Sequence, residues 1–361
     1  MSAPVANRNG PVLIMAGGTG GHIFPGLAVA DELVARKIPV VWFGSVGGLE
    51  TQLVPRHRLR LETLPIGGLR GKGILTKLAM PFRLARGVVA ARSLLRQHAP
   101  RCAISMGGYA AAPGGIAAHI AKVPLVVHEQ NGIAGVTNRL LAGRAQRVLT
   151  GFADVFPRGE WVGNPVRATI AAVAPPAQRY AGREGPLRLL VLGGSQGAQS
   201  LNAALPEVLR RRGARLPVAV RHQCGSRHFD KARAAYMNAG IEADVVPFED
   251  DMAAAYAWAD LVICRSGALT LAELAAAGVP AILVPYPSAV DDHQTKNAQA
   301  MVSAGAARLV SEGDDFVKRL GAAFEEIGER TRLLRMANAA GALAKPDAAR
   351  RIAEICLEVG A

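Results

Sequence analysis

The first residues that could do chemistry lie in a glycine-rich stretch near the start of the chain. It reads MAGGTGGHIFPGLAVA over residues 15–30, with four glycines in five positions followed directly by His22. A glycine loop that opens a helix directs backbone N–H groups and the positive end of the helix dipole at an anion. A histidine there is well placed to act as a base, because the helix N-terminus favours the neutral imidazole. The stretch therefore predicts either a dinucleotide site or an anion-binding loop that carries a base.

The dinucleotide interpretation fails at two positions. The Rossmann fingerprint requires G-x-G-x-x-G and an acidic residue roughly 20 positions later. Here Ile23 stands in place of the third glycine, and the next predicted strand leads into Ser45 without an acid. A second glycine loop, GGSQG at residues 193–197, lacks the acid too, and no P-loop Gly-Lys-Ser/Thr follows either loop. The two glycine loops together therefore predict a general anion-binding role. For either loop taken alone, the alternative is a plain turn between a strand and a helix.

Other candidate residues lie where predicted strands end. Arg265 precedes a small-residue turn and Glu273, an arrangement that could bind a diphosphate and, through the carboxylate, the hydroxyls of a ribose. The alternative for Glu273 is an acid that merely stabilises a helix N-terminus. Gln294 and Asn297 could bind sugar hydroxyls or belong to a polar loop that caps a helix. In the first half, polar groups follow apolar runs in MGGY, residues 106–109, and HEQN, residues 128–131.

A parallel α/β scaffold is needed to bring these residues together. Apolar runs of strand length alternate with helical periods, and the plan restarts at LRLLVL, which predicts two Rossmann-like domains. Residues 171–186, rich in proline and alanine, are predicted to be a linker. A last helix, residues 347–359, has an apolar face that must dock elsewhere on the protein. The predicted strands are residues 11–16, 39–44, 102–106, 124–128 and 148–152, then 187–192, 218–223, 243–247, 261–264 and 281–285.

The charge of the chain is strongly positive and unevenly spread. The 361 residues carry a formal net charge of +14, and residues 51–101 hold eleven lysines and arginines against one acid, Glu62. Bulky apolar residues are interleaved with these bases, as in segments that rest on an anionic bilayer. The alternative is an ordinary helix with its apolar face in the core. Aromatic residues make up 5% of the chain and no base-recognition motif occurs, which disfavours nucleic acid as a partner.

Seven strings, spread over nearly the whole chain, resemble the MurG family of bacterial peptidoglycan N-acetylglucosaminyltransferases. In order they are GGTGGHIFPGLAVA, GLRGKG, MGGYAAAPGG, HEQNGIAG, GNPVR, GGSQGA and CRSGALTLAE. The resemblance implies the α/β GT-B glycosyltransferase fold, with two Rossmann-like domains facing across a cleft and a C-terminal helix crossing back to the first. It divides the chain into an acceptor- and membrane-binding domain, residues 1–166 with the returning helix 346–361, and a UDP-GlcNAc-binding domain, residues 167–345.

The resemblance also implies the reaction. Members of this family move N-acetylglucosamine (GlcNAc) from UDP-GlcNAc to the 4-hydroxyl of MurNAc in undecaprenyl-pyrophosphoryl-MurNAc-pentapeptide (lipid I), with inversion, to give lipid II. The implied acceptor contacts are Thr19, Gly20, Gly21, His22, Tyr109, Glu129 and Asn131. The implied donor contacts are Thr19, Gly20, Gly21, Asn131, Arg167, Ser195, Gln196, Phe248, Glu249, Arg265, Leu269, Thr270, Glu273, Gln294 and Asn297.

The lipid tail of such an acceptor stays in the bilayer, which gives the basic segment a role as a membrane face. This membrane face is predicted to comprise Lys72, Leu75, Lys77, Leu78, Met80, Phe82, Arg83 and Arg86. The expected location is peripheral, on the cytoplasmic side of the bacterial inner membrane, and the scattered cysteines agree with a reduced compartment. The implied partners are UDP-GlcNAc, lipid I, anionic inner-leaflet phospholipids and other cell-wall synthesis proteins.

An inverting transfer needs a base for the attacking hydroxyl and stabilisation of the departing diphosphate. His22 is the leading candidate for the base and Glu129 the second, whereas capping the helix or binding phosphate is the alternative role of His22. The helix after Arg265 could stabilise the diphosphate, and the chain has no D-x-D motif, so neither metal nor cofactor is expected. The rival functions are a related GT-B enzyme, such as a UDP-GlcNAc 2-epimerase or a UDP-galactose-dependent glycolipid transferase, and a non-enzymatic UDP-sugar- or membrane-binding scaffold.

Overall fold

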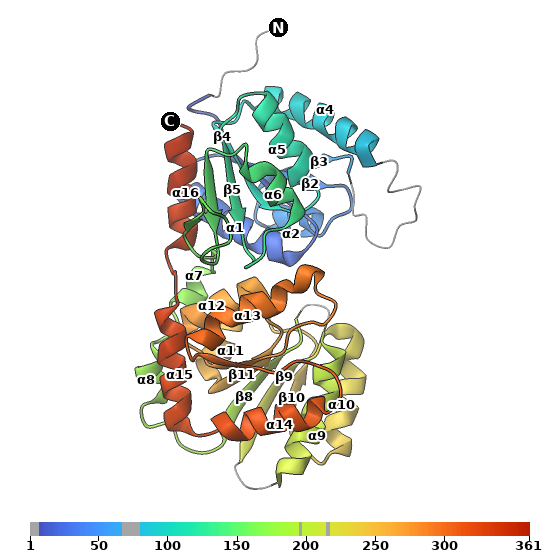
Figure 1. Ribbon diagram of the computed structural model, residues 1–361, viewed down its shortest axis with the longest axis vertical. Coiled ribbons are helices and arrows are strands. Elements are labelled where there is room, and N and C mark those ends of the chain that lie inside the picture. Colours follow the sequence, from blue (N-terminus) through green and yellow to red (C-terminus); the bar gives the residue numbers. More distant parts are fainter. Residues whose placement is uncertain (1–6, 67–79, 195–196, 214–216) are drawn as a thin grey trace. The chain divides into compact units, whose positions relative to one another are not determined.

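The computed structural model describes residues 7–66, 80–194, 197–213 and 217–361. The chain divides into two compact units: Met1–Pro165 with Asp347–Ala361, and Val166–Pro346. Each unit is built around one parallel β-sheet (Figure 1). The prediction of a linker at residues 171–186 is wrong, because this segment belongs to the second unit and buries Arg179 and Tyr180. Arg179 donates hydrogen bonds to the carbonyl oxygens of Ala277 and Gly278, which ties the segment to its unit.

The sheet of the first unit has its strands in the order β3-β2-β1-β4-β5-β6-β7 within the described residues, and neighbouring strands pair in parallel. Four of its strands are buried along their full length, which explains their mainly apolar sequences. The strands are β1 (Val12–Ala16), β2 (Val40–Ser45), β3 (Arg60–Leu64), β4 (Cys102–Gly107), β5 (Leu125–Glu129), β6 (Arg147–Thr150) and β7 (Glu160–Trp161).

Helices cover both faces of this sheet. They are α1 (Gly20–Ala35), α2 (Glu50–Arg56), α4 (Met80–His98), α5 (Ala111–Ile120), α6 (Val136–Ala142) and α16 (Ala348–Val359). Ile352 and Cys356 of α16 pack with Val12 and Ile14 of β1 in one buried cluster, and α16 lies against α1. The expected docking of the last helix on the first unit is thereby confirmed. On the opposite face, α4, α5 and α6 cover a second cluster.

The sheet of the second unit repeats the plan, with strand order β10-β9-β8-β11-β12-β13 and parallel pairing throughout its described strands. Its strands are β8 (Leu187–Leu192), β9 (Val218–Gln223), β10 (Asp244–Val246), β11 (Leu261–Cys264), β12 (Ala281–Leu283) and β13 (Ala307–Leu309). The sequence patterns predict most strands but miss β3, β7 and β13. Each of these three lies at an edge of its sheet and includes exposed or half-buried positions, so it lacks the apolar run of a central strand.

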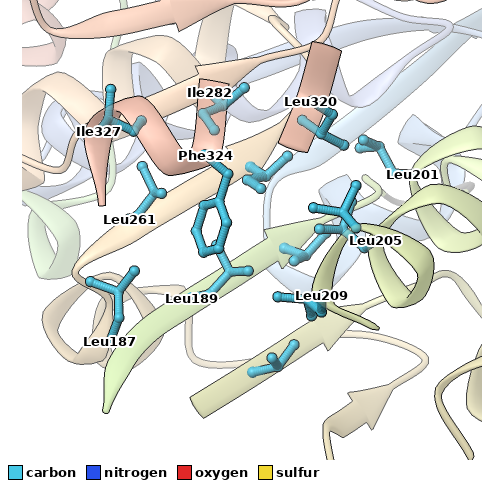
Figure 2. Close-up of a cluster of buried hydrophobic side chains, with 14 of the residues drawn as sticks. Leu187, Leu189, Leu201, Leu205, Leu209, Leu261, Ile282, Leu320, Phe324 and Ile327 are labelled. Atoms are coloured by element: carbon cyan, nitrogen blue, oxygen red, sulfur yellow. The ribbon is translucent and has the colours of Figure 1, made fainter. Parts of the chain in front are cut away.

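The core of the second unit forms between its sheet and the helices packed on it (Figure 2). Leu201, Leu205 and Leu209 form an apolar stripe on α9 at helical spacing. Phe324 of α14 and Leu189 of β8 belong to the same buried cluster. The helices of this unit are α7 (Ala168–Ala171), α8 (Pro176–Tyr180), α9 (Gln199–Arg212), α10 (Phe229–Asn238), α11 (Met252–Trp258), α12 (Ala268–Ala277), α13 (His293–Ser303), α14 (Phe316–Ile327) and α15 (Arg330–Ala342), with 3₁₀ turns η2 (Ser226–His228) and η3 (Val290–Asp292).

Candidate active site

The first glycine loop connects β1 to α1. Thr19 is the N-cap of α1 in an extended conformation and gives the helix no side-chain cap, which leaves first-turn N–H groups for an incoming anion. Gly18 has a φ of 95°, a conformation that glycine adopts without strain. The MGGY loop after β4 packs directly against it, since a Cβ atom on Gly108 would lie 2.1 Å from the carbonyl oxygen of Gly17. The glycines therefore allow the two loops to touch.

A buried acid that the sequence analysis missed holds this loop. Glu50, at the start of α2, is fully buried, and its carboxylate accepts hydrogen bonds from the backbone N–H of Gly18 at 3.1 Å and of Ser45 at 2.7 Å. The Ser45 hydroxyl donates a third bond at 2.7 Å. A Cβ atom on Gly17 would lie 2.4 Å from an oxygen of this carboxylate. Only glycine at position 17 therefore leaves room for the Glu50 side chain. No local pattern marks Glu50, because its partners come from other segments.

His22 is the third residue of α1 and is half-buried. Its Nδ1 atom lies 3.2 Å from Oε1 of Gln130, which follows β5. Its ring also lies against Gly107 at the end of β4, where a Cβ atom would come within 3.0 Å of the imidazole. His22 thus lies between the loops that follow β1, β4 and β5. These loops are at the carboxyl ends of the strands, where open parallel sheets bind their ligands.

Glu129, the last residue of β5, is buried and fully engaged by its own loop. One carboxylate oxygen accepts the backbone N–H of Asn131 at 3.0 Å and its side-chain amide at 3.3 Å. The other accepts the backbone N–H of Gly135 at 3.1 Å and the side-chain amide of Asn138 at 2.9 Å. A buried carboxylate that accepts hydrogen bonds from four donors holds the conformation of its loop.

Of the remaining acceptor candidates, Tyr109 is half-buried beside Gly18.

The second glycine loop follows β8 and is held by the side-chain amide of Gln223, which the sequence analysis did not identify. Gln223, at the end of β9, accepts the N–H of Gly194 at 3.1 Å and donates to its carbonyl oxygen at 3.0 Å. Gly197 has a φ of 77°, and a Cβ atom there would lie 2.2 Å from the carbonyl oxygen of Cys224. The predicted donor contacts Ser195 and Gln196 lie outside the described residues.

Arg265 directly follows β11 and is held by contacts on several sides. Its guanidinium donates to the carbonyl oxygens of Val284 at 3.2 Å and Pro285 at 3.1 Å, and to the Ser200 hydroxyl at 3.0 Å. It also forms an ion pair of 2.5 Å with Glu312, an acid absent from the predicted site. Its orientation is therefore set within the protein, beside the N-terminus of α12.

Two predicted donor contacts meet in the second unit. Arg167 donates to Oε1 of Glu273 at 3.1 Å, and the Tyr256 hydroxyl donates to Oε2 at 3.0 Å. Burial raises the pKa of the Glu273 carboxyl above its ordinary value, and the Arg167 charge opposes this shift. Glu273 lies in the second turn of α12. Its carboxylate is paired with the Arg167 guanidinium and remains partly accessible.

The other donor candidates surround the same helix or lie on neighbouring loops. Leu269 and Thr270 are in the first turn of α12, and buried Asn297 donates from α13 to the carbonyl oxygen of Ser266 at 3.3 Å. Gln294 accepts the backbone N–H of Tyr286 at 2.9 Å. After β10, the Phe248 side chain is 56% exposed and available for stacking. Glu249 is instead paired with Arg221 at 3.1 Å.

The predicted membrane face falls partly on α4. Ala91 and Leu95 of this helix are buried in the core, whereas Phe82 is 81% and Val89 69% exposed on the outside. The predicted bases Arg83 and Arg86 are exposed beside Phe82. The core-packing alternative therefore holds for the inner side of α4, and the membrane role of its outer side stays a prediction. The predicted residues Lys72, Leu75, Lys77 and Leu78, and the side chain of Met80, lie outside the described residues.

Two kinds of feature are absent from the described part of the chain. None of its helices has the length and hydropathy required to cross a membrane. It also contains no group of three or more His, Cys, Asp or Glu side chains that could hold a metal ion.

Comparisons with known proteins place the chain in a family. Residues 12–150 match the glycosyltransferase family 28 N-terminal domain, and residues 188–352 match the glycosyltransferase family 28 C-terminal domain. A UDP-N-acetylglucosamine–N-acetylmuramyl-(pentapeptide) pyrophosphoryl-undecaprenol N-acetylglucosamine transferase from Xanthomonas euvesicatoria pv. vesicatoria (strain 85-10) is 55% identical over 99% of this chain and 83% of its own length. A protein of the same name from Xylella fastidiosa (strain M12) is 54% identical over 96% of both chains.

A solved structure agrees with these relatives. The crystal structure of Acinetobacter baumannii MurG superposes with a TM-score of 0.87 and 37% sequence identity, covering 97% of this chain and 99% of that one. Together with the two Rossmann-type sheets, the comparisons confirm the predicted GT-B fold. The chain therefore belongs to glycosyltransferase family 28 and, within it, to the MurG family of N-acetylglucosaminyltransferases.

Proposed function

We propose that this enzyme transfers GlcNAc from UDP-GlcNAc to the 4-hydroxyl of the MurNAc of lipid I, with inversion, and so makes lipid II for peptidoglycan. The observation that carries the proposal is the 55% identity, over 99% of the chain, with a transferase named for this reaction. The acceptor hydroxyl attacks C1 of GlcNAc while the bond from C1 to the diphosphate oxygen breaks. The electron pair of that bond leaves with UDP, and the hydroxyl proton passes to a base.

The proposed test measures UDP release from UDP-GlcNAc by the full chain, with and without a soluble lipid I analogue. Release should depend on the analogue and should persist in EDTA, because no metal ion is assigned a role. Release without acceptor, together with epimerisation of GlcNAc, would instead identify the rival 2-epimerase. Binding of UDP-GlcNAc without any turnover would identify a scaffold.

The loops of the first unit are proposed to hold the acceptor. The pyrophosphate of lipid I would lie at the N-terminus of α1, on Thr19, Gly20 and Gly21, where helix N–H groups favour an anion. Tyr109 and Asn131 would flank it. We assign the base to His22, because its ring is accessible and it sits at this helix start. Glu129 is assigned a positioning role, because its oxygens already accept four hydrogen bonds.

The second unit is proposed to hold the donor. Glu273 would accept both ribose hydroxyls, while Arg265, Leu269 and Thr270 would surround the diphosphate at the N-terminus of α12 and stabilise its charge as UDP leaves. The uracil is assigned to Phe248 and Glu249. Further donor contacts are assigned to Arg167, Ser195, Gln196, Gln294 and Asn297, and to Thr19, Gly20, Gly21 and Asn131 of the first unit.

Donor binding should weaken in acid because of Glu273. Only the ionised carboxylate can accept from both ribose hydroxyls, and burial raises its pKa above the ordinary value. The KM for UDP-GlcNAc should therefore rise as pH falls through this raised pKa. Arg167→Ala removes the charge that opposes the shift, so the rise in KM should begin at a higher pH. Steady-state KM measured against pH tests this, and an unchanged profile in Arg167→Ala would contradict the proposed coupling.

The enzyme is proposed to rest on the cytoplasmic face of the bacterial inner membrane through α4 and the basic segment before it. The double variant Arg83→Glu/Arg86→Glu should bind vesicles containing phosphatidylglycerol about 10- to 30-fold more weakly, since each base near an anionic surface contributes about 1 kcal/mol. Vesicle co-sedimentation measures the change. Lys231→Glu/Arg233→Glu, an equal change of charge at exposed positions of α10, is the control and should bind as wild type. Equal binding of all three proteins would make α4 an ordinary surface helix.

Other cell-wall synthesis proteins remain proposed partners.

A further inference from the structure

A side-chain amide connects two histidines beneath the first glycine loop. Gln130 is 1% exposed and lies between His22 on α1 and His128 on β5. Its Oε1 atom is 3.2 Å from Nδ1 of His22, and its Nε2 atom is 3.1 Å from Nδ1 of His128. On the far side of His128, Nε2 lies 2.9 Å from the carbonyl oxygen of Gly163. The four groups form one hydrogen-bonded chain within the first unit.

The direction of each hydrogen bond follows from the ends of this chain. The Gly163 carbonyl oxygen can only accept, so Nε2 of His128 must carry a hydrogen. His128 is fully buried, and burial lowers its pKa to about 4, so its imidazole is neutral and Nδ1 carries the lone pair. Nδ1 of His128 therefore accepts from the amide of Gln130.

The orientation of the Gln130 amide has independent support. Its Nε2 atom also lies 3.2 Å from the carbonyl oxygen of His128 and 3.6 Å from the sulfur of Met106, both of which only accept. An amide oxygen in that place would face acceptors alone. The backbone is held too, since Asn164 donates to the carbonyl oxygen of Gln130 at 2.9 Å and Asn138 to that of His128 at 3.0 Å. Oε1 of Gln130 must therefore face His22, where it can only accept.

We propose that Gln130 is a positioning residue that holds neutral His22 in the tautomer with hydrogen on Nδ1, so that Nε2 is the atom that takes the proton of the attacking hydroxyl. Among the described residues, Nε2 of His22 has no hydrogen-bond partner within the protein. In the reaction, the proton of the 4-hydroxyl moves to Nε2, the oxygen bonds to C1, and UDP leaves with the electron pair. Nδ1 keeps its hydrogen and its bond to Gln130 throughout. This inference rests on the proposed role of His22 as base.

The tautomer can be measured without an activity assay. In protein labelled with ¹⁵N-histidine, imidazole nitrogens with and without hydrogen have distinct chemical shifts. The His22 signals are assigned by their loss in His22→Ala. We expect wild-type His22 to carry hydrogen on Nδ1, and His128 on Nε2. Hydrogen on Nε2 of neutral His22 would overturn the inference, and this result needs no variant of Gln130 to fold.

Gln130→Met then separates positioning from packing. It removes the acceptor for Nδ1 while nearly preserving side-chain volume, so the His22 tautomers should mix and kcat should fall by about 10- to 100-fold, less than for loss of the base itself. The dissociation constant for UDP-GlcNAc should stay unchanged. Met106→Leu alters packing at the same amide without touching Oε1 and should keep both the His22 signals and kcat. Wild-type kcat and tautomer in Gln130→Met would refute the positioning role.

The two proposals fail in different ways. If His22→Ala keeps its turnover, then His22 is not the base, although the ¹⁵N shifts still report whether Gln130 sets its tautomer. If His22→Ala is inactive while Gln130→Met turns over normally, the base stands and only the positioning role of Gln130 is lost.

Discussion

Replacing His22 with alanine is expected to lower kcat by about 10²- to 10⁴-fold, the range for removal of a general base. The dissociation constant for UDP-GlcNAc should change little. His22 lies in the first unit, whereas Arg265 and Glu273, proposed to hold the diphosphate and ribose, belong to the second. The variant therefore removes the proposed proton acceptor and keeps the main proposed donor contacts. Steady-state turnover with a lipid I analogue and equilibrium titration with UDP-GlcNAc measure the two quantities separately.

A second histidine of the same unit serves as the control. His119 lies exposed near the C-terminal end of α5, away from the glycine loops, and His119→Ala should turn over as wild type. Near-normal turnover in His22→Ala would remove His22 from the chemistry and leave it the alternative role of binding phosphate. A large loss of donor affinity in His22→Ala would instead show that it contributes to the donor site.

Replacing Glu129 with glutamine is expected to destabilise the protein by about 2–4 kcal/mol, because buried N–H donors lose a charged acceptor and face an NH₂ group. Two of the four donors to the carboxylate would face the new NH₂ group in place of an acceptor oxygen, whichever way the amide turns. The loop that carries Asn131 should loosen as a result, and the KM for the acceptor should rise. Chemical denaturation measures the free energy of unfolding, and steady-state kinetics measures KM.

Unfolding and turnover together separate positioning from proton transfer at Glu129. Glu160 on β7 provides the control, since it is a half-exposed acid paired with Arg147 and Arg351. Glu160→Gln should cost less than about 1 kcal/mol, as expected for a surface ion pair. If Glu129→Gln abolishes kcat while its unfolding free energy equals that of wild type, Glu129 is a base and the positioning role is wrong.

Local patterns were sufficient for most of the central strands. β8, β9 and β11 have the predicted bounds. The reason is clearest for β11, which is buried along its full length and apolar throughout, as expected for a strand covered on both faces. The edge strands β3, β7 and β13 escaped prediction because they are exposed in part. Residues 171–186 were misread as a linker because proline and alanine also occur in short packed helices such as α8.

The sequence by itself determined the strand-to-helix glycine loops, the position of His22 at a helix start, and the family to which the chain belongs, since each depends on residues adjacent along the chain. Only the tertiary structure decided the partners of these residues. Gln130 lies 108 residues from His22, and Gln223 lies 29 residues from Gly194. Buried hydrogen bonds of this kind form wherever the fold brings donor and acceptor together, so local spacing carries no trace of them. The sequence made His22 a candidate base, and only the fold shows that Oε1 of Gln130 lies 3.2 Å from its Nδ1 atom.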